Sequence, residues 1–85
     1  MPPHITITIR FDTELQKLTG NTGHPVFMSE GATFAFLLMS VFEEYSEIEN
    51  KYPPGTLGFM VNEVPPKMYT PLFDGDIVSF SVVNY

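Results

Sequence analysis

Two histidines and two aspartates are the residues of this sequence whose types and spacing could hold a metal ion. His4 and His24 would lie near each other if the segments around them pair as strands, and two imidazoles can begin a metal site. Asp74 and Asp76 flank a glycine, as the acids of calcium-binding loops do. The histidines have no third ligand at a fixed spacing, and the aspartates lack the further oxygen ligands and the closing glutamate of a calcium loop. We therefore expect a tight turn at residues 74–76, and neither a bound metal nor a cofactor.

Nucleophilic and redox chemistry have equally little support in the sequence. The chain contains no cysteine, which excludes a disulfide, a thiolate nucleophile, a zinc–thiolate site and an iron–sulfur cluster. We identify no Ser-His-Asp pattern, glycine-rich phosphate loop or buried pair of carboxylates, and a chain of 85 residues has little room for a deep pocket of its own. The sequence predicts that this protein is not an enzyme by itself.

The chain is acidic, and its charge is unevenly distributed. Its 10 acidic and 4 basic residues give a formal net charge of −6. This balance counts against a nucleic acid as partner, because clustered basic residues are needed to neutralise phosphates. Before residue 30 two basic residues balance two acidic ones, so residues 30–85 carry the whole −6. An electrostatic docking surface would therefore lie in residues 30–85 and would suit a basic partner.

Nothing in the sequence predicts export or insertion into a membrane. The amino terminus shows no basic segment followed by an apolar stretch. The longest apolar helical segment is broken by glutamates and is far shorter than the roughly 20 residues of a membrane span. Hydrophobic residues make up 44% of the chain and charged residues 16%, a balance typical of folded proteins. We expect residues 1–85 to form a single cytoplasmic domain around one small core.

The first third of the sequence predicts two strands. Apolar and polar residues alternate from His4 to Phe11, which places the isoleucines and Phe11 on one face of a half-buried strand. Residues 12–18 suit a short helical turn, and residues 20–23 suit a reversal of the chain. Residues 24–29 then form a second strand, antiparallel to the first because the connection is too short for a crossover helix.

A helix follows, with Thr33 as its expected N-cap. Apolar residues recur at helical spacing from Phe34 to Ile48, and Pro53-Pro54-Gly55 ends the helix. Glutamates gather toward its end, where the helix dipole disfavours negative charge: Glu43, Glu44, Glu47 and Glu49. These glutamates are either a solvated surface or part of a surface that binds a basic partner.

The remaining residues predict two further strands. Residues 56–61 suit a strand, residues 62–63 a turn, and the prolines at 65–66 an irregular segment. Residues 77–83 form a last strand that is almost wholly apolar, as in a strand buried on both faces at the centre of a sheet. The element order predicts an α+β fold, with a mixed sheet of about four to five strands covered by one main helix. If the last strand lies beside the first, this is the β-grasp arrangement.

Four segments of the chain resemble the small sulfur-carrier family, which includes the small subunit of molybdopterin synthase and the thiamine sulfur carrier. They are the opening strand Ile-Thr-Ile-Arg-Phe, residues 29–33 (Ser-Glu-Gly-Ala-Thr), residues 61–63 (Val-Asn-Glu) and residues 70–78 (Thr-Pro-Leu-Phe-Asp-Gly-Asp-Ile-Val). The resemblance implies a ubiquitin-like β-grasp fold. It also implies a flexible carboxyl-terminal Gly-Gly that an E1-like partner adenylates, that becomes a thiocarboxylate and that enters the active site of a synthase.

The sequence contains no Gly-Gly dipeptide, and its last residues are Val83-Asn84-Tyr85. Two functions remain. In the first, the protein is a non-catalytic interaction module, or the small subunit of a larger enzyme complex such as one that holds a metal cofactor. In the second, it is a sulfur carrier for molybdopterin or thiamine biosynthesis with a truncated or atypical tail. Both functions require a larger protein as partner, either an enzyme subunit or an E1-like or synthase protein.

The chain has more large apolar residues than its core needs, and about half of them are expected to be exposed. They are Met1, Met28, Met39, Met60, Met68, Phe59, Tyr69, Phe73, Phe80 and Tyr85. By resemblance, the partner packs against the exposed face of the sheet and the tail. This maps partner binding onto Phe59, Phe80, Val82 and Tyr85, with Glu43, Glu44 and Glu47 as the acidic contribution.

Overall fold

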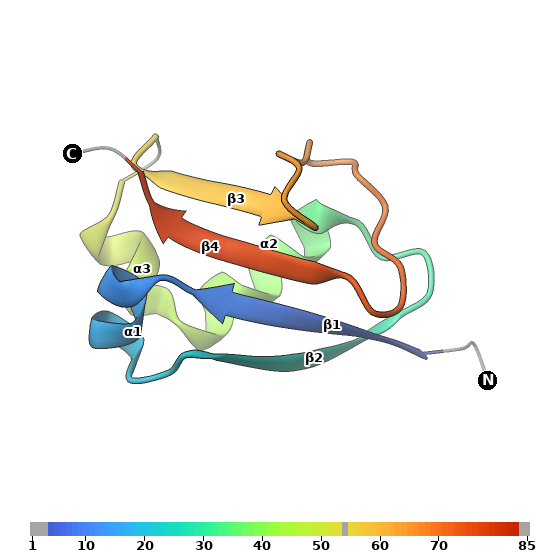
Figure 1. The fold of residues 1–85 in the computed structure, drawn as a ribbon, viewed down its shortest axis with the longest axis horizontal. Coiled ribbons are helices and arrows are strands. Elements are labelled where there is room, and N and C mark those ends of the chain that lie inside the picture. The colour runs from blue at the N-terminus through green and yellow to red at the C-terminus, as the bar shows by residue number, and fades with distance from the viewer. Residues whose placement is uncertain (1–3, 54, 84–85) are drawn as a thin grey trace.

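The computed structural model describes residues 4–53 and 55–83. It contains seven elements (Figure 1): β1 (His4–Phe11), α1 (Thr13–Thr19), β2 (Gly23–Ser29), α2 (Phe34–Glu44), α3 (Ser46–Lys51), β3 (Leu57–Val61) and β4 (Ile77–Val82). The four strands form one sheet in the order β2-β1-β4-β3. β1 pairs with β4 in parallel, and each of these central strands carries an antiparallel neighbour at the edge. The predicted α+β fold, with the last strand beside the first, is confirmed.

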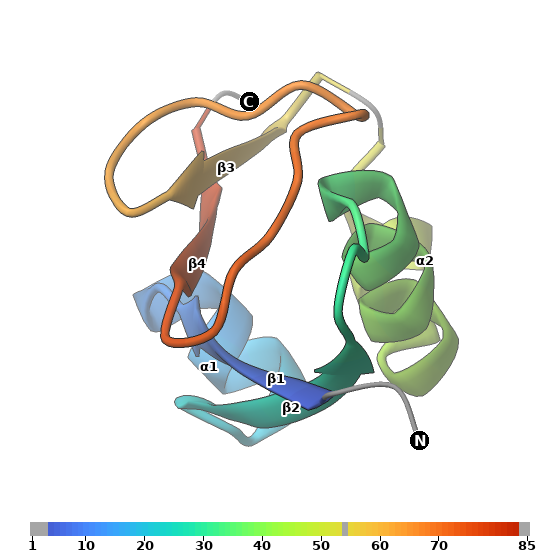
Figure 2. The ribbon, with the colours of Figure 1, turned by 90° about the vertical axis from the view of Figure 1, so that its right-hand side faces the viewer.

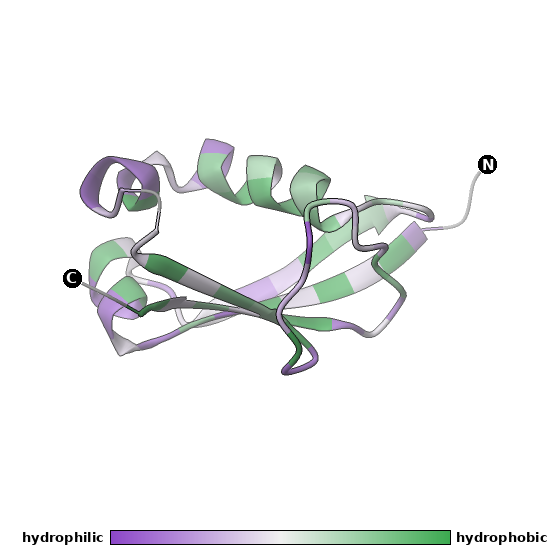
Figure 3. Cartoon of the chain, turned by 90° about the horizontal axis from the view of Figure 1, so that it is seen from above, coloured by the Kyte–Doolittle hydropathy of each residue, from purple (hydrophilic) through white to green (hydrophobic). Residues whose placement is uncertain are grey.

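The sheet and the helices form two layers. Figure 2 shows α2 beside one face of the sheet, and the opposite face carries no helix in front of it in Figure 1. The ribbon of α2 is largely hydrophobic and that of α3 largely hydrophilic (Figure 3), in keeping with their sequences. The helices therefore cover the sheet from one side only.

The alternation predicted for the first strand determines which side is covered. The isoleucines of β1 and Phe11 face inward and form one core with residues of every other element except β3: Met28, Leu15, Phe34, Leu37, Leu38, Val41, Tyr45, Ile48, Leu72, Val78 and Phe80. In β4, Val78 and Phe80 are buried, whereas Ile77 and Ser79 are half-buried. The prediction that both faces of this strand are buried is therefore wrong, because no described segment fully covers its outer side chains.

The carboxylate of Asp12 joins three segments at one end of the sheet. Its Oδ1 accepts a hydrogen bond from the backbone N–H of Leu15 at 2.9 Å and so caps α1. Its Oδ2 accepts from the N–H of Val82 at 2.8 Å, and its own N–H donates to the carbonyl of Phe80 at 3.0 Å. One side chain thus fixes the end of β1, the start of α1 and the end of β4.

The segment between β3 and β4 returns along the sheet through two turns. Asn62 and Glu63 both have positive φ, at 49° and 70°, as a two-residue hairpin turn requires. Asp74 accepts a hydrogen bond from the N–H of Thr6 at 2.8 Å, and Asp76 accepts one from the N–H of Phe73 at 2.9 Å. Asp76 also accepts from the amide of Asn62 at 2.9 Å. The two aspartates are turn residues, as predicted.

The single helix predicted over residues 34–48 is wrong, because the chain breaks at Tyr45. This residue leaves the helical region, with φ −123° and ψ 62°, and its ring turns inward. It packs edge-on against Phe11, with ring centroids 5.3 Å apart. As a consequence Glu47 and Glu49 lie in the first turn of α3, where the helix dipole favours negative charge rather than opposing it.

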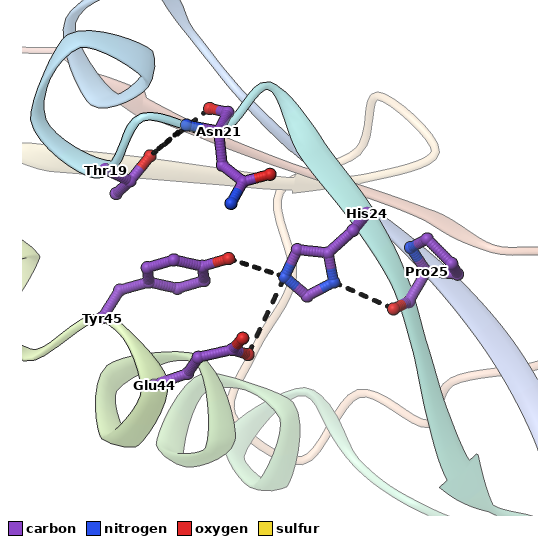
Figure 4. A network of polar contacts seen from close by, with 6 residues as sticks. All are labelled: Thr19, Asn21, His24, Pro25, Glu44 and Tyr45. Atoms are coloured by element: carbon purple, nitrogen blue, oxygen red, sulfur yellow. Dashed lines mark hydrogen bonds and ion pairs between the residues drawn. The ribbon is translucent and has the colours of Figure 1, made fainter.

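A hydrogen bond joins this break to β2 (Figure 4). Nδ1 of His24 lies 2.9 Å from the carbonyl of Pro25, and its Nε2 lies 2.8 Å from the hydroxyl of Tyr45. Because a carbonyl only accepts, the neutral ring carries its proton on Nδ1, and Tyr45 donates to Nε2. Burial raises the pKa of the Tyr45 hydroxyl, and the nearby carboxylates of Glu44 and Glu47 raise it further.

We predict that Asp12→Asn destabilises the fold by about 1–3 kcal/mol. Asn has a single acceptor oxygen, so one of the two backbone N–H groups loses its hydrogen bond to this side chain. The free energy of unfolding in urea measures the loss. Glu14→Gln is the matched control, since Glu14 is exposed and its ion pair with Lys17 spans 3.8 Å. An equal loss in both variants would contradict the role assigned to Asp12.

We predict that Tyr45→Phe costs about 1 kcal/mol near neutral pH, through the lost hydrogen bond to His24. The raised pKa of Tyr45 means that the unfolded chain releases this proton first, so the stability of the native protein falls as pH rises above 10.0, the ordinary value for tyrosine. The deficit of the variant should therefore shrink above that pH. Urea titrations over a series of alkaline pH values measure the stability of the variant and of the native protein. The control Tyr69→Phe, at an exposed tyrosine, should have the same stability as the native protein throughout.

Candidate docking surfaces

The uncovered face of the sheet is the first candidate surface, and we call it the outer sheet face. It is formed by the strand residues whose side chains point away from α2: His4, Thr6, Thr8, Arg10, Gly23, Pro25, Phe27, Ser29, Gly58, Met60, Ile77, Ser79 and Ser81. Phe27 is 73% exposed and Met60 is 44% exposed. No residue of this set is acidic, although the chain has a net charge of −6. The outer sheet face is therefore a low-charge surface on an acidic protein.

Small side chains fill the centre of the outer sheet face. Thr8 lies between Pro25 and Ile77, and small hydroxyl side chains fill most of the central positions. At one end Gly58 allows Val83 to lie across β3, because a Cβ on residue 58 would overlap the side chain of Val83. Val83 is itself 58% exposed. A surface with few bulky side chains at its centre and apolar ones at its margins suits contact with another protein.

The residues predicted to bind a partner through the sheet do not lie on this face. Phe59, Phe80 and Val82 all point inward, because Phe59 and Phe80 are direct cross-strand partners and Val82 lies two positions further along β4. Phe80 is 1% exposed and lies in the core, so its placement on an exposed face is wrong. Phe59 and Val82 are half-buried against the same core. Tyr85, the fourth predicted contact, lies outside the described residues.

The predicted acidic contribution lies on the helical layer. Glu43 and Glu44 end α2, and Glu47 lies in α3. Glu44 is 3.7 Å from Nε2 of His24, an ion pair whenever that imidazole is protonated. These glutamates therefore cannot share one flat surface with the outer sheet face.

A hollow of about 600 Å³ between the helical layer and β3 is the second candidate surface, and we call it the β3 groove. Its apolar lining comes from Leu38, Phe42, Tyr52, Leu57, Phe59 and Met68. Glu49 and Asn50 add polar groups from α3. Sequence reasoning identified Phe59 but not the groove, because the break at Tyr45 and the course of the segment around Met68 decide its walls.

The expected surplus of exposed apolar residues is present. Met39, Met60, Met68, Tyr69 and Phe73 are exposed, whereas Met28 and Phe80 belong to the core. Four further large apolar residues are exposed that were not predicted to be so: Phe27, Phe36, Val64 and Val83. Phe27 could have been found from the alternation of β2, because Val26 and Met28 face inward on either side of it.

The two histidines that suggested a metal site are separated along the sheet. The strands that carry them do pair, but His4 is opposite Ser29 and His24 is opposite Ile9. Five strand positions between them correspond to about 16 Å. Within residues 4–53 and 55–83, no group of three or more metal-binding side chains is present. No helix in these ranges is long and apolar enough to cross a membrane.

The chain matches no protein-family model and no curated protein in sequence. Among solved structures, a protein assigned as molybdopterin converting factor, subunit 1, from Pyrococcus furiosus matches 93% of this chain and 98% of its own, with a TM-score of 0.84 and 15% identity. Small archaeal modifier protein 1 of Haloferax volcanii matches with the same coverage, a TM-score of 0.80 and 12% identity.

Urm1 from Trypanosoma brucei matches 98% of this chain and 96% of its own, with a TM-score of 0.71 and 19% identity. At these identities the likeness concerns the fold. The likeness covers nearly the whole of this chain and of each of these three chains. The chain therefore has the ubiquitin-like β-grasp fold, as the sequence resemblance implies.

Proposed function

We infer that this protein is a non-catalytic interaction module that docks onto a larger protein through the outer sheet face. The observation that carries this function is the contrast between that face and the rest of the chain. A net charge of −6 favours solubility and opposes self-association. The face with Phe27 and Met60 nevertheless contains no carboxylate. A larger protein can bury this face without desolvating an unpaired acid.

The names of two structural neighbours support a function in association. One is described as a subunit of molybdopterin converting factor and another as a modifier protein. By analogy, we propose that this chain acts as a small accessory subunit, without catalytic residues of its own and in the cytoplasm. This analogy rests on fold and carries less weight than the outer sheet face does.

A sulfur carrier is the second candidate function, favoured by the fold shared with a molybdopterin converting factor subunit. The end of β4 would suit this function, because the N–H of Val82 is held by Asp12 and that of Val83 donates to the carbonyl of Thr56 at 2.9 Å. The chain is thus held in place up to Val83. The carrier chemistry needs a terminal Gly-Gly that the printed sequence does not contain.

Native mass spectrometry of the protein, purified from its own cells through an amino-terminal tag, separates the two functions. We expect the protein, without a thiocarboxylate, in a stoichiometric complex with a larger protein. A longer chain that ends in Gly-Gly, heavier by the difference between sulfur and oxygen, would instead establish the carrier. Recovery of the free monomer alone would contradict the accessory-subunit function.

We predict that Met60→Lys weakens binding to the partner recovered in this way by about tenfold or more, because it places an unpaired charge at the contact. Phe36→Ser is the control, since Phe36 is 61% exposed but lies on α2, in the other layer. Titration calorimetry measures both affinities, and circular dichroism checks that both variants fold. Equal affinity of Met60→Lys and the native protein would exclude the outer sheet face as the docking surface.

A further inference from the structure

The β3 groove opens onto a strand edge with unpaired backbone groups. β3 is an edge strand, and its ladder with β4 alternates between hydrogen-bonded and non-bonded residue pairs. At its two ends, Val83 donates to Thr56 at 2.9 Å and Asn62 donates to Ile77 at 2.8 Å. The backbone N–H and C=O groups of Gly58 and Met60 therefore point toward β4, and those of Leu57 and Phe59 point away from β4.

The backbone groups of Val61 also point away from β4, but they already form hydrogen bonds within the chain. Its N–H donates to the carbonyl of Val64 at 2.8 Å, and its carbonyl accepts from the N–H of Val64 at 3.0 Å. No hydrogen bond from the described residues occupies the outward backbone groups of Leu57 and Phe59 in the same way. The side chains of both residues line the groove, so the unpaired main chain and the apolar lining lie together.

The walls of the groove combine a fixed frame with adaptable side chains. The N–H of Ala35 donates to the carbonyl of Met68 at 3.0 Å, and that of Phe34 donates to Thr70 at 2.8 Å. These bonds tie the segment around Met68 to the first turn of α2. Met68, which lines the groove, is 58% exposed, and a thioether side chain adjusts readily to different apolar groups.

The rim of the groove is acidic. A smaller hollow of about 230 Å³, lined by Met39, Phe42, Glu43 and Glu49, shares Phe42 and Glu49 with the β3 groove. Neither glutamate forms an ion pair with a described residue, whereas Glu44 lies beside His24. The basic group nearest in sequence, Lys51, lies over the ring of Tyr52, 5.8 Å from its centroid. A ligand of this groove therefore gains from positive charge.

We propose that the β3 groove binds an extended segment of a partner protein that carries apolar side chains flanked by lysine or arginine. The segment adds a strand to β3 through Leu57 and Phe59, and its apolar side chains enter the groove. Its basic residues meet Glu43 and Glu49. A second copy of this chain fits poorly, because the acidic rims would face each other. This surface is separate from the outer sheet face and goes beyond the function proposed above.

The peptide acetyl-Lys-Thr-Leu-Thr-Leu-Thr-Lys-amide tests the proposal, since it places both leucines and both lysines on one face of a strand. We expect it to shift the backbone amide resonances of Leu57 and Phe59 in the isotope-labelled protein. Glutamate in place of both lysines should weaken binding by about tenfold or more. Shifts centred on Thr8 and Arg10, or no shift at millimolar peptide, would overturn the proposal.

Two further comparisons separate strand addition from simple apolar contact. One peptide is N-methylated at both leucines, its third and fifth residues, and another at two of its three threonines, its fourth and sixth residues. The two peptides lose backbone N–H donors that point to opposite edges of the strand. One of them should lose binding and the other keep it, whichever way the strand runs, and equal binding by both would exclude strand addition. The variant Glu43→Gln with Glu49→Gln should weaken binding about fivefold, whereas Glu14→Gln with Glu30→Gln, of equal net charge, should not.

Discussion

The parallel contact between β1 and β4 is the constraint on which the rest of this fold depends. It joins the first and last strands, and the hydrogen bond from Val82 to Asp12 spans 70 positions of sequence. Once these strands lie side by side at the centre, each can gain only one more neighbour, and the chain between them has to pack against one face. Asp12 links this pairing to α1, so one side chain holds both the end of the sheet and the start of the first helix.

Sequence patterns predicted the fold more completely than the surfaces. The alternation of β1 is unambiguous because Thr and Arg separate its isoleucines, and the inward face follows directly. β3 has no such separation: Phe59 and Met60 are both large and apolar, so only the pairing with β4 decides which one faces outward. Tyr45 suits a helix face by spacing, and a tertiary contact with Phe11 and His24 turns it out of the helix instead. The candidate surfaces depend on which residues of β3 face outward and on the break at Tyr45, and local sequence patterns contain neither.

The one-sided covering of the sheet gives the molecule two surfaces of different character. The outer sheet face is low in charge, whereas the helical layer carries glutamates around an apolar hollow. The two meet at β3, where Met60 and Phe59 point to opposite sides of the same strand. A single edge strand thus contributes to both surfaces, and Gly58 within that strand leaves room for the close approach of the Val83 side chain.

The position of Pro25 in β2 makes the two edges of the sheet differ in their ability to accept a further strand. The hydrogen bond from Phe11 to Thr22 sets the phase of the β1–β2 ladder, and in that phase residue 25 would direct its N–H away from β1. Proline has no N–H, so this edge lacks a donor in the middle of its length. A strand can therefore be added on the β3 side but is opposed on the β2 side. The sheet can thus accept one added strand, at β3, and strand addition does not continue from molecule to molecule into a fibre.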